Sequence, residues 1–237
     1  MTSLLNGKLG PANTRAGRIG ILIKWGKLKH LEALLNGILH LNTPEFYRMR
    51  PADAFGDPNE SCGYSYRNTR DRTPPTLMID GREIDEFVDL TVFNGPARES
   101  YLHCWTALTL PADSNELEIM KRDFLRMRDE FGPDYVSLPA DRIDQFIQSV
   151  AEADALSPIG RRVTYSKEPK DWNSLCKDSR YSFQREFRFL VGPCVPSVPT
   201  PKKLFLGDLS SVMSINADLG LLYEGEHILR MHGERIL

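Results

Sequence analysis

The sequence predicts a mixed α+β protein with a β-sheet core. Several short runs, either wholly apolar or alternating between apolar and polar residues, are typical of strands, and longer stretches repeat hydrophobic residues at helical spacing. The 237 residues are 41% hydrophobic and 26% charged, which is ordinary for a globular chain long enough to bury a core. We interpret residues 18–237 as a single domain and residues 1–17, rich in glycine, as a flexible N-terminal arm.

The first predicted unit is a strand, a helix and a second strand. Residues 18–25 form an apolar run bounded by glycines, which is typical of a buried strand. Residues 27–36 place four leucines on one helical face, and Gly37 follows in the C-cap position. Residues 38–42 predict the second strand, and residues 43–47 predict a turn that leads out of it.

Residues 48–82 contain many prolines and glycines and predict a long loop region. Five of its arginines are interleaved with tyrosines in and beside the loop: Arg48, Arg50, Arg67, Arg70 and Arg72 with Tyr47, Tyr64 and Tyr66. Such a pattern could contact a phosphate-bearing ligand or a nucleic acid. The alternative is a solvated loop, which the net charge of -2 favours.

A strand and a helix are predicted in the middle of the chain. Residues 101–110 are mostly apolar and predict a central strand. Asp113 and Glu116 have the spacing of a capping box, which starts a helix. A hydrophobic stripe at helical spacing follows, and we interpret it as core: Leu117, Met120, Phe124 and Met127.

Shorter elements complete the prediction. They are a hairpin over residues 77–84 with Asp80-Gly81 at its tip, strands at 135–138 and 161–165, a helix at 141–150, a helical turn or loop at 171–177 and a last strand from Lys203. The tail, 224–237, is weakly patterned and carries no assignment.

The most site-like stretch is 180–191, which alternates as a strand would and ends at Gly192-Pro193. The alternation predicts aromatic side chains on one face and Gln184, Glu186 and Arg188 in a row on the other. A carboxylate between an amide and a guanidinium suggests a functional site. The alternative is an ion pair on a solvated face, which contributes at most about 1 kcal/mol.

Composition argues against several classes of function. The pI of about 6.2 gives no overall basic field of the kind that nucleic acids attract. The four cysteines are isolated, which favours a reduced, cytosolic protein, and the five histidines do not pair with them at zinc-ligand spacing. Apolar runs fall well short of the roughly 20 residues that span a bilayer, so we expect no membrane partner.

The order of these elements resembles the ADP-ribosyltransferase-like fold and is similar to a bacterial and phage domain family of unknown function with abortive-infection members. An ordered set of motifs carries the resemblance: the L-x-x-x-L-x-x-G helix with its following strand and T-P-E-x-F turn (31–46), His103-Cys104-Trp105, the strand 181–188, and the L-x-x-G-D-L run (204–209). It covers most of residues 18–215. The resemblance implies a split, mixed or antiparallel sheet core flanked by helices.

In ADP-ribosyltransferases a Q-x-E strand start supplies the catalytic glutamate. The resemblance therefore implies that Glu186 stabilises the oxocarbenium-like state formed when the nicotinamide–ribose bond of NAD breaks, and that Gln184 orients the acceptor. It implies a cofactor site made by Lys24, Trp25, His40, Asn42, Thr43, Phe46 and Arg188. Lys24 stands where the family carries Arg or His, and Leu41-Asn42-Thr43 stands where it carries Ser-Thr-Ser or Tyr.

Three hypotheses follow. The first is an NAD-dependent mono-ADP-ribosyltransferase in phage–host conflict, with a protein or nucleic-acid acceptor. The second is a non-enzymatic binding or inhibitor protein of a bacterial defence system, which contacts a host or phage protein through residues 48–82. The third and weaker one is a metal-dependent nuclease that holds Mg²⁺ with Asp85, Glu86 and Asp89, a cluster that is otherwise a charged surface face.

Overall fold

The computed structural model describes residues 3–4, 17–50, 56–69, 71–84, 86–93, 99–155, 158–195, 198–223, 226–232 and 235–236. The N-terminal arm predicted for residues 1–17 lies almost wholly outside these residues. Ser3–Leu4, which is described, forms a short strand, β1, that pairs parallel with β16 (Leu219–Tyr223) near the C-terminus.

The chain is a mixed α+β protein, and a six-stranded sheet forms its centre. The strands of this sheet are β2 (Ile19–Trp25), β8 (Ser100–Thr109), β9 (Tyr135–Pro139), β10 (Ile159–Arg162), β13 (Glu186–Pro193) and β15 (Ser214–Ile215). Their order is β10-β13-β8-β2-β9-β15, and every neighbouring pair is antiparallel. β8, predicted as a central strand, lies between β13 and β2.

Helices and small sheets surround this central sheet. The α-helices are α1 (Leu28–Leu35), α2 (Pro44–Arg48), α3 (Ser114–Phe131) and α4 (Ile143–Asp154). Four of the small sheets are strand pairs: β3 (Ile38–Leu41) with β14 (Lys202–Phe205), β4 (Cys62–Arg67) with β7 (Asp89–Phe93), β5 (Leu77–Ile79) with β6 (Arg82–Ile84), and β11 (Thr164–Ser166) with β12 (Cys176–Asp178). In the sheet near the C-terminus, β16 pairs with β17 (Glu226–His232), and β17 also pairs with β18 (Arg235–Ile236).

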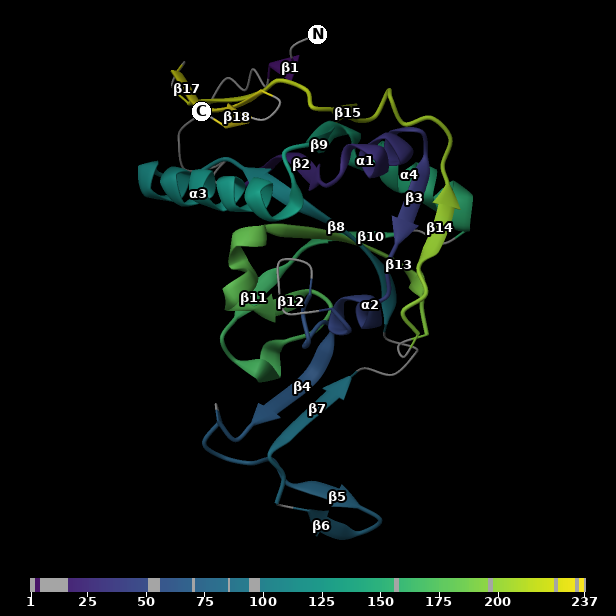
Figure 1. Cartoon of the computed structure of the whole chain (residues 1–237), viewed down its shortest axis with the longest axis vertical. Coiled ribbons are helices and arrows are strands. Elements are labelled where there is room, and N and C mark those ends of the chain that lie inside the picture. Colours follow the sequence, from purple (N-terminus) through teal and green to yellow (C-terminus); the bar gives the residue numbers. More distant parts are fainter. Residues whose placement is uncertain are drawn as a thin grey trace.

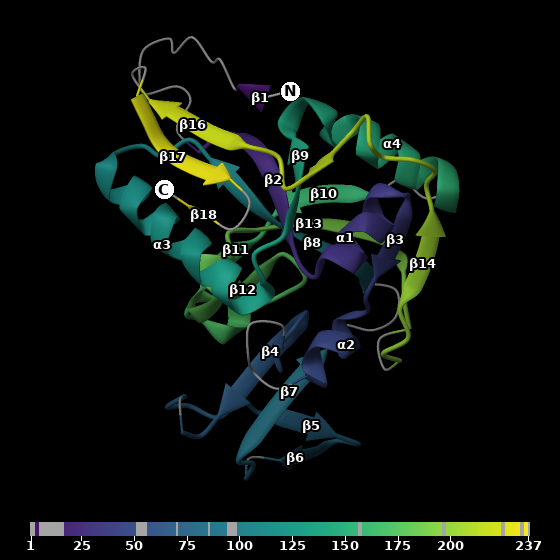
Figure 2. The same cartoon turned by 45° about the horizontal axis from the view of Figure 1, so that its top comes forward.

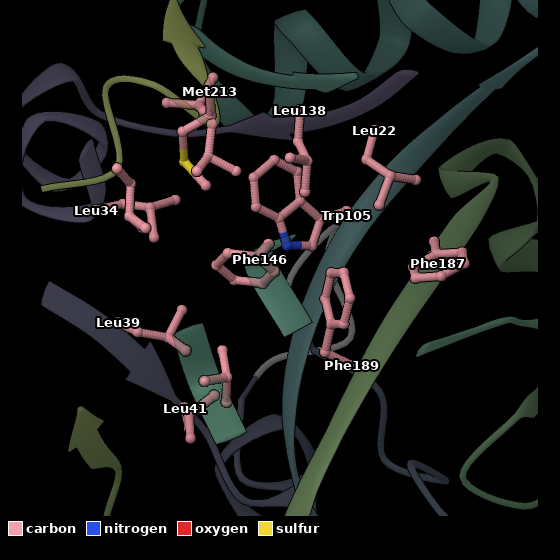
Figure 3. Packing of buried hydrophobic residues seen from close by; sticks show 14 of the residues in the cluster. Leu22, Leu34, Leu39, Leu41, Trp105, Leu138, Phe146, Phe187, Phe189 and Met213 are labelled. Carbon is pink, nitrogen blue, oxygen red and sulfur yellow. The ribbon is translucent and has the colours of Figure 1, made fainter. Parts of the chain in front are cut away.

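Two hydrophobic clusters cover the two faces of the sheet. Helices α1 and α4 pack on one face, where Trp105 contacts Phe146, Phe146 contacts Phe189, and Phe189 contacts Phe187 (Figure 3). Helix α3 and the β16–β17 pair cover the other face (Figure 2). The predicted stripe on α3 is core, as Met120, Phe124 and Met127 are all buried. Because side chains alternate along β8 and β13, their remaining residues point to the opposite face of the sheet.

The predicted strand–helix–strand unit is confirmed as β2, α1 and β3. Gly37 ends α1 with a φ of 84°, and a Cβ there would lie 1.9 Å from the carbonyl oxygen of Gly207, so only glycine fits. The turn predicted after β3 is instead the short helix α2, because the Thr43 hydroxyl caps it and Pro44 occupies its first position. Helix α3 begins at the predicted capping residue, Asp113.

The region predicted as a long loop contains a projecting β-ribbon. The predicted hairpin is confirmed as β5 and β6, and β4 and β7, which were not predicted, pair at its base. In sequence, β5 and β6 lie between β4 and β7, so one strand pair continues into the other. Both pairs extend away from the rest of the molecule (Figures 1 and 2). We call residues 62–93 the ribbon. It exposes apolar side chains, including Met78 and Val88, which are 57% and 68% exposed.

The prediction of one strand over 180–191 is wrong in its first half. Ser179–Gln184 is a 3-10 helix, and β13 begins only at Glu186. Between them Arg185 adopts a left-handed backbone with a φ of 45°, held by bonds from its guanidinium to Asp123 and Thr109. Gln184 therefore does not share a strand face with Glu186 and Arg188. The alternative of a solvated ion pair is also wrong, because both residues are buried.

The C-terminal region contains more strand than its sequence predicted. Residues 226–232 and 235–236 are strands β17 and β18, inside the stretch interpreted as weakly patterned. Among the residues described, none of the helices combines the length and the apolar composition that crossing a bilayer demands.

Candidate functional site

A buried cluster of charged side chains lies on the face of β13 opposite Phe187 and Phe189. It contains Glu186 and Arg188 from β13, Lys177 from β12, and Asp57 and Glu60 from the turn that precedes β4. All five are at most 7% exposed. We call these residues the charge cluster, and the turn of residues 56–61 closes it from one side.

Arg188 is the centre of the charge cluster and is fully buried. Its Nη1 and Nη2 donate to the two carboxylate oxygens of Glu60 at 2.6 and 2.7 Å, which is the bidentate geometry of a strong arginine–carboxylate pair. Its Nε donates to Glu186 at 2.6 Å and Nη2 reaches the second oxygen of Glu186 at 3.2 Å. Nη1 also donates to the carbonyl oxygen of Ser174 at 2.7 Å. These bonds use all five N–H donors of the guanidinium.

Lys177 lies among four side-chain oxygens. Its Nζ donates to Gln184 at 3.0 Å and to Glu186 at 3.3 Å, and it lies 3.7 Å from Glu60 and 3.9 Å from Asp57. Burial lowers the pKa of Lys177, but Glu186 and Glu60 outweigh it and raise the pKa above its ordinary value. The ammonium therefore stays charged and neutralises the carboxylates around it. Gln184 joins the cluster through this contact, although it is not on the strand.

Glu186 is held in its ionised form. Burial raises the pKa of this carboxyl, but Arg188 and Lys177 outweigh burial and bring the pKa well below its usual range. The Cys104 thiol adds a further hydrogen bond. A carboxylate that is ionised at neutral pH and enclosed by protein can stabilise a positive charge that develops beside it more strongly than in water.

Asp57 is a carboxyl group of the cluster whose surroundings disfavour its charged form. Burial and the neighbouring Glu60 raise the pKa of Asp57 to about 6, although Lys177 partly opposes them. One of its oxygens accepts the backbone N–H of Asn59 at 3.0 Å. At neutral pH Asp57 is therefore charged although its surroundings favour the protonated form, and this destabilises the folded protein.

We expect Asp57→Asn to stabilise the protein at neutral pH. Because the pKa of Asp57 is higher in the folded than in the unfolded chain, the native protein loses stability as pH rises from about 4 to about 6, and the loss persists above pH 6. It amounts to about 3 kcal/mol. Urea unfolding at pH 7.5 should therefore give the variant a higher free energy of unfolding, and the difference should shrink at pH 5. A variant equally or less stable at pH 7.5 contradicts this.

A second group of polar side chains adjoins Glu186 on the other side. Lys24 Nζ donates to the carbonyl oxygen of Cys104 at 2.7 Å. The Tyr47 hydroxyl lies 3.8 Å from the Cys104 sulfur and accepts from the Asn42 amide at 3.3 Å. We call Lys24, Asn42, Tyr47 and Cys104 the polar corner.

The pKa values of the ionisable groups in the polar corner are shifted because these groups are enclosed. Burial lowers the pKa of the Lys24 amine, and Cys104 and Glu186 only partly oppose it. Burial, with Glu186 acting in the same direction, raises the pKa of Cys104 to about 12, so its thiol is protonated. Burial also raises the pKa of Tyr47 well above its ordinary value. The corner therefore presents hydrogen-bond donors beside the ionised carboxylate of Glu186.

The structure thus brings together five of the nine predicted site residues: Glu186, Gln184, Arg188, Lys24 and Asn42. The other four lie elsewhere. Trp25 packs in the core against Phe124 and Tyr135. Thr43 caps α2 and donates to the carbonyl oxygen of Val198.

The remaining two predicted residues are His40 and Phe46. His40 is exposed on β3, and its carbonyl oxygen lies 3.1 Å from His103 Nδ1. Phe46 contacts Tyr47 of the polar corner edge to face and lies beneath the guanidinium of Arg50. Arg188, also predicted for the cofactor, uses all five of its donors within the protein in this arrangement.

Two of the described arginines of residues 48–82 bond within the protein. Arg48 bonds Glu45, Glu99 and the carbonyl oxygen of Glu60, and Arg67 bonds backbone carbonyls of the ribbon and Thr91. Arg72 is exposed, and Arg70 lies outside the described residues. Two of the five therefore hold the protein itself together.

Three residues of the charge cluster were not predicted from the sequence: Asp57, Glu60 and Lys177. The signal for the first two was present: Asp57-Pro58-Asn59-Glu60 is a turn sequence with two carboxylates three residues apart. Nothing local marks Lys177, because its partners Glu60 and Asp57 lie far away in sequence. Tyr47 and Cys104 were named in the sequence patterns, but neither was assigned to the site.

No metal centre supports the nuclease hypothesis in the part of the chain that the structure describes. No group of three histidine, cysteine, aspartate or glutamate residues is arranged there to hold an ion. Glu86 and Asp89 are exposed, and Asp85 lies outside the described residues. All four cysteines are free thiols, and three of them are buried.

The site therefore centres on Glu186, an ionised and enclosed carboxylate that belongs to the charge cluster and adjoins the polar corner. Its residues come from six separate segments of the chain. Comparison with known proteins adds no further information, since no family model, curated protein or solved structure matches this chain.

Proposed function

We propose that the protein is an NAD-dependent mono-ADP-ribosyltransferase with Glu186 as its catalytic residue. One observation carries the proposal: β2, the end of β3 and the start of β13 bring Lys24, Asn42 and Glu186 to one place. These are the strand positions at which the resemblance expects the cofactor grip, the second motif and the catalytic glutamate. The three residues are far apart in sequence, so their convergence does not follow from local pattern.

The chemistry requires a negative charge beside the ribose. The C1′–N bond to nicotinamide breaks, nicotinamide leaves with the electron pair, and the acceptor forms a new bond to C1′. Positive charge develops on the ribose in the transition state, and an ionised carboxylate nearby stabilises it. Arg188 and Lys177 keep Glu186 in the ionised form that this role needs. Arg188 thus acts as a positioning residue.

The donor groups of the polar corner fit the polar atoms of a ribose and a carboxamide. Lys24 contributes an amine, Asn42 an amide and Tyr47 a hydroxyl, all within the neighbourhood of Glu186. We assign these three residues to holding the nicotinamide riboside half of the cofactor. Trp25, His40, Thr43 and Phe46 are left out of the proposed site for the reasons given above.

We expect NAD to raise the melting temperature of the native protein. At a concentration of about 100 times Kd, a ligand that binds only the folded state adds about 2.7 kcal/mol. For a chain of this size that corresponds to a shift of about 5 °C or more. Differential scanning calorimetry with and without NAD measures it.

Lys24→Met is the variant to compare. It keeps the length and apolar stem of the side chain and removes the donor, so the NAD-dependent shift should fall while the variant stays folded. An unchanged melting temperature of the native protein in NAD would count against the enzyme. An equal shift in Lys24→Met would remove Lys24 from the site.

A non-enzymatic binding protein is the second candidate, and the ribbon is the observation that favours it. The ribbon exposes apolar side chains along its length: Met78, Ile79 and Ile84 in the β5–β6 hairpin, and Val88, Val92 and Phe93 in or beside β7. Exposed apolar groups that cluster on a projecting element are typical of a protein contact. The contact would thus depend on these side chains rather than on the arginines. The same calorimetry separates the two candidates, because a pure binding protein gives no shift with NAD.

A further inference from the structure

The turn of residues 56–61 is the only part of the charge cluster that is not carried by the strands and the 3-10 helix around β13. It reaches Arg188 through the carboxylate of Glu60, in a bidentate pair at 2.6 and 2.7 Å. Carboxylates and phosphates both match the planar fork of arginine in this way. Glu60 therefore occupies the position that an oxyanion of a ligand would take on Arg188.

The charges favour an anion in place of the turn. Without Asp57 and Glu60, the cluster consists of two cations, Arg188 and Lys177, and one carboxylate, Glu186. These three residues carry one excess positive charge, and the N–H groups of Arg188 and Lys177 that faced Glu60 are then available to a ligand. An enclosed site with this balance attracts a phosphate group strongly.

The turn is also under strain in the closed arrangement. Asp57 and Glu60 are neighbouring carboxyl groups in one buried space, and Glu60 disfavours the charged form of Asp57. Ser61 has a φ of 56°, in the left-handed region that residues other than glycine rarely adopt. Besides the pair between Glu60 and Arg188, the described bonds from the turn to the rest of the protein include Asp57 N–H to the Tyr47 carbonyl, the Tyr181 hydroxyl to the Gly56 carbonyl, and Arg48 to the Glu60 carbonyl.

We propose that residues 56–61 form an internal plug, and that the diphosphate group of the substrate replaces the Glu60 carboxylate on Arg188 and Lys177. The proposal rests on the proposed function for the identity of the substrate. It also explains how an enclosed Glu186 becomes accessible: the turn that covers it leaves when the diphosphate arrives. The plug is thus an autoinhibitory contact that only a ligand with this group releases.

Glu60→Gln tests the plug by weakening it. The amide keeps the shape of the side chain but loses the charge that Arg188 attracts, so the open form should be more populated and the apparent Kd should fall. Isothermal titration with inorganic pyrophosphate should give a Kd lower by about tenfold than that of the native protein. The control is Asp154→Asn, which removes a carboxylate charge that pairs with Lys202 on β14 and lies outside the charge cluster. Its Kd should equal the native value.

Asp57→Asn tests the plug in the opposite direction and covers the case in which Glu60→Gln fails to fold. Removing the repulsion from Glu60 strengthens the closed turn, so pyrophosphate should bind more weakly at pH 7.5. Simple electrostatics predicts the reverse, because a negative charge near the anion has been removed. Tighter binding by Asp57→Asn, or unchanged binding by a folded Glu60→Gln, overturns the proposal.

Hydrogen exchange then separates the plug from the enzyme. The Asp57, Glu60 and Cys62 amides are hydrogen-bonded in the closed turn, so pyrophosphate should accelerate exchange in a peptide covering 56–62 of the native protein. Slower or unchanged exchange there overturns the plug. If pyrophosphate gives this response but NAD does not, the plug stands and the substrate is a diphosphate other than NAD.

Discussion

Arg188→Met is expected to be the most destabilising single substitution in the charge cluster. The methionine fills much of the space of the arginine stem but leaves Glu60 and Glu186 facing each other with only Lys177 to neutralise them. Removing one partner of a buried ion pair costs about 3–5 kcal/mol, because the other charge stays buried and unpaired. Since whole domains are stable by only about 5–15 kcal/mol, urea unfolding should detect a shift of the midpoint by a large fraction of its native value.

Arg185→Met provides the matched control for this prediction. The two arginines are three positions apart, but Arg185 is partly exposed, and its contacts to Asp123 and Glu116 are 3.4 and 3.5 Å long. Partly exposed ion pairs contribute about 0–1 kcal/mol, so the control should lose little stability. Equal small losses in both variants would show that the charge cluster does not clamp β13 to the turn of residues 56–61.

The elements that the sequence predicted well are those fixed by local rules. Helix α3 begins at Asp113 because the side chain caps Glu116, and its apolar stripe repeats at 3.6 residues, so both signals lie within one segment. The hairpin β5–β6 was predicted from the dipeptide Asp80-Gly81, which favours a two-residue turn. Both residues adopt the positive φ that such a turn requires. Gly37 ends α1 for the same kind of reason.

Part of the site was predicted from strand alternation and part from the resemblance. Glu186 and Arg188 alternate along β13, so patterning selected them, whereas Lys24 near the end of β2 was selected by the resemblance. The rest depends on contacts that no local rule contains. Glu60 and Arg188 are 128 positions apart. Gln184 lies outside the strand because Arg185 adopts a left-handed backbone, and the Arg185 side chain bonds Asp123 on α3 and Thr109 on β8.

Burial gives the predicted pair Glu186 and Arg188 a larger effect on charge and stability than exposure would. An ion pair between Glu186 and Arg188 on a solvated face would have little effect on stability or chemistry. The same pair, enclosed beneath the turn of residues 56–61, holds the glutamate ionised and determines the orientation of the carboxylate. Whether a side chain is enclosed depends on which turn packs over it, and this cannot be read from alternation along one strand.

Glu186→Gln should reduce ADP-ribosyl transfer and NAD hydrolysis by at least about 100-fold, the size of effect seen when a group that stabilises transition-state charge is removed. The amide retains the shape of the carboxylate but has no negative charge for the ribose cation. Release of nicotinamide from NAD is the direct readout, since it does not require the acceptor to be known. Unaltered release by a folded variant would remove Glu186 from the chemistry.

The variant should also be less stable, because Arg188 and Lys177 lose the charge that both of them contact. A fall in rate could then reflect unfolding, so release must be measured well below the melting temperature and divided by the folded fraction. Asp154→Asn makes the comparison specific: it removes a partly buried carboxylate charge that pairs with Lys202, outside both the proposed site and the charge cluster. If that control keeps the native rate per folded molecule while Glu186→Gln does not, loss of a carboxylate charge in general cannot explain the difference, and the result supports a direct role for the carboxylate of Glu186.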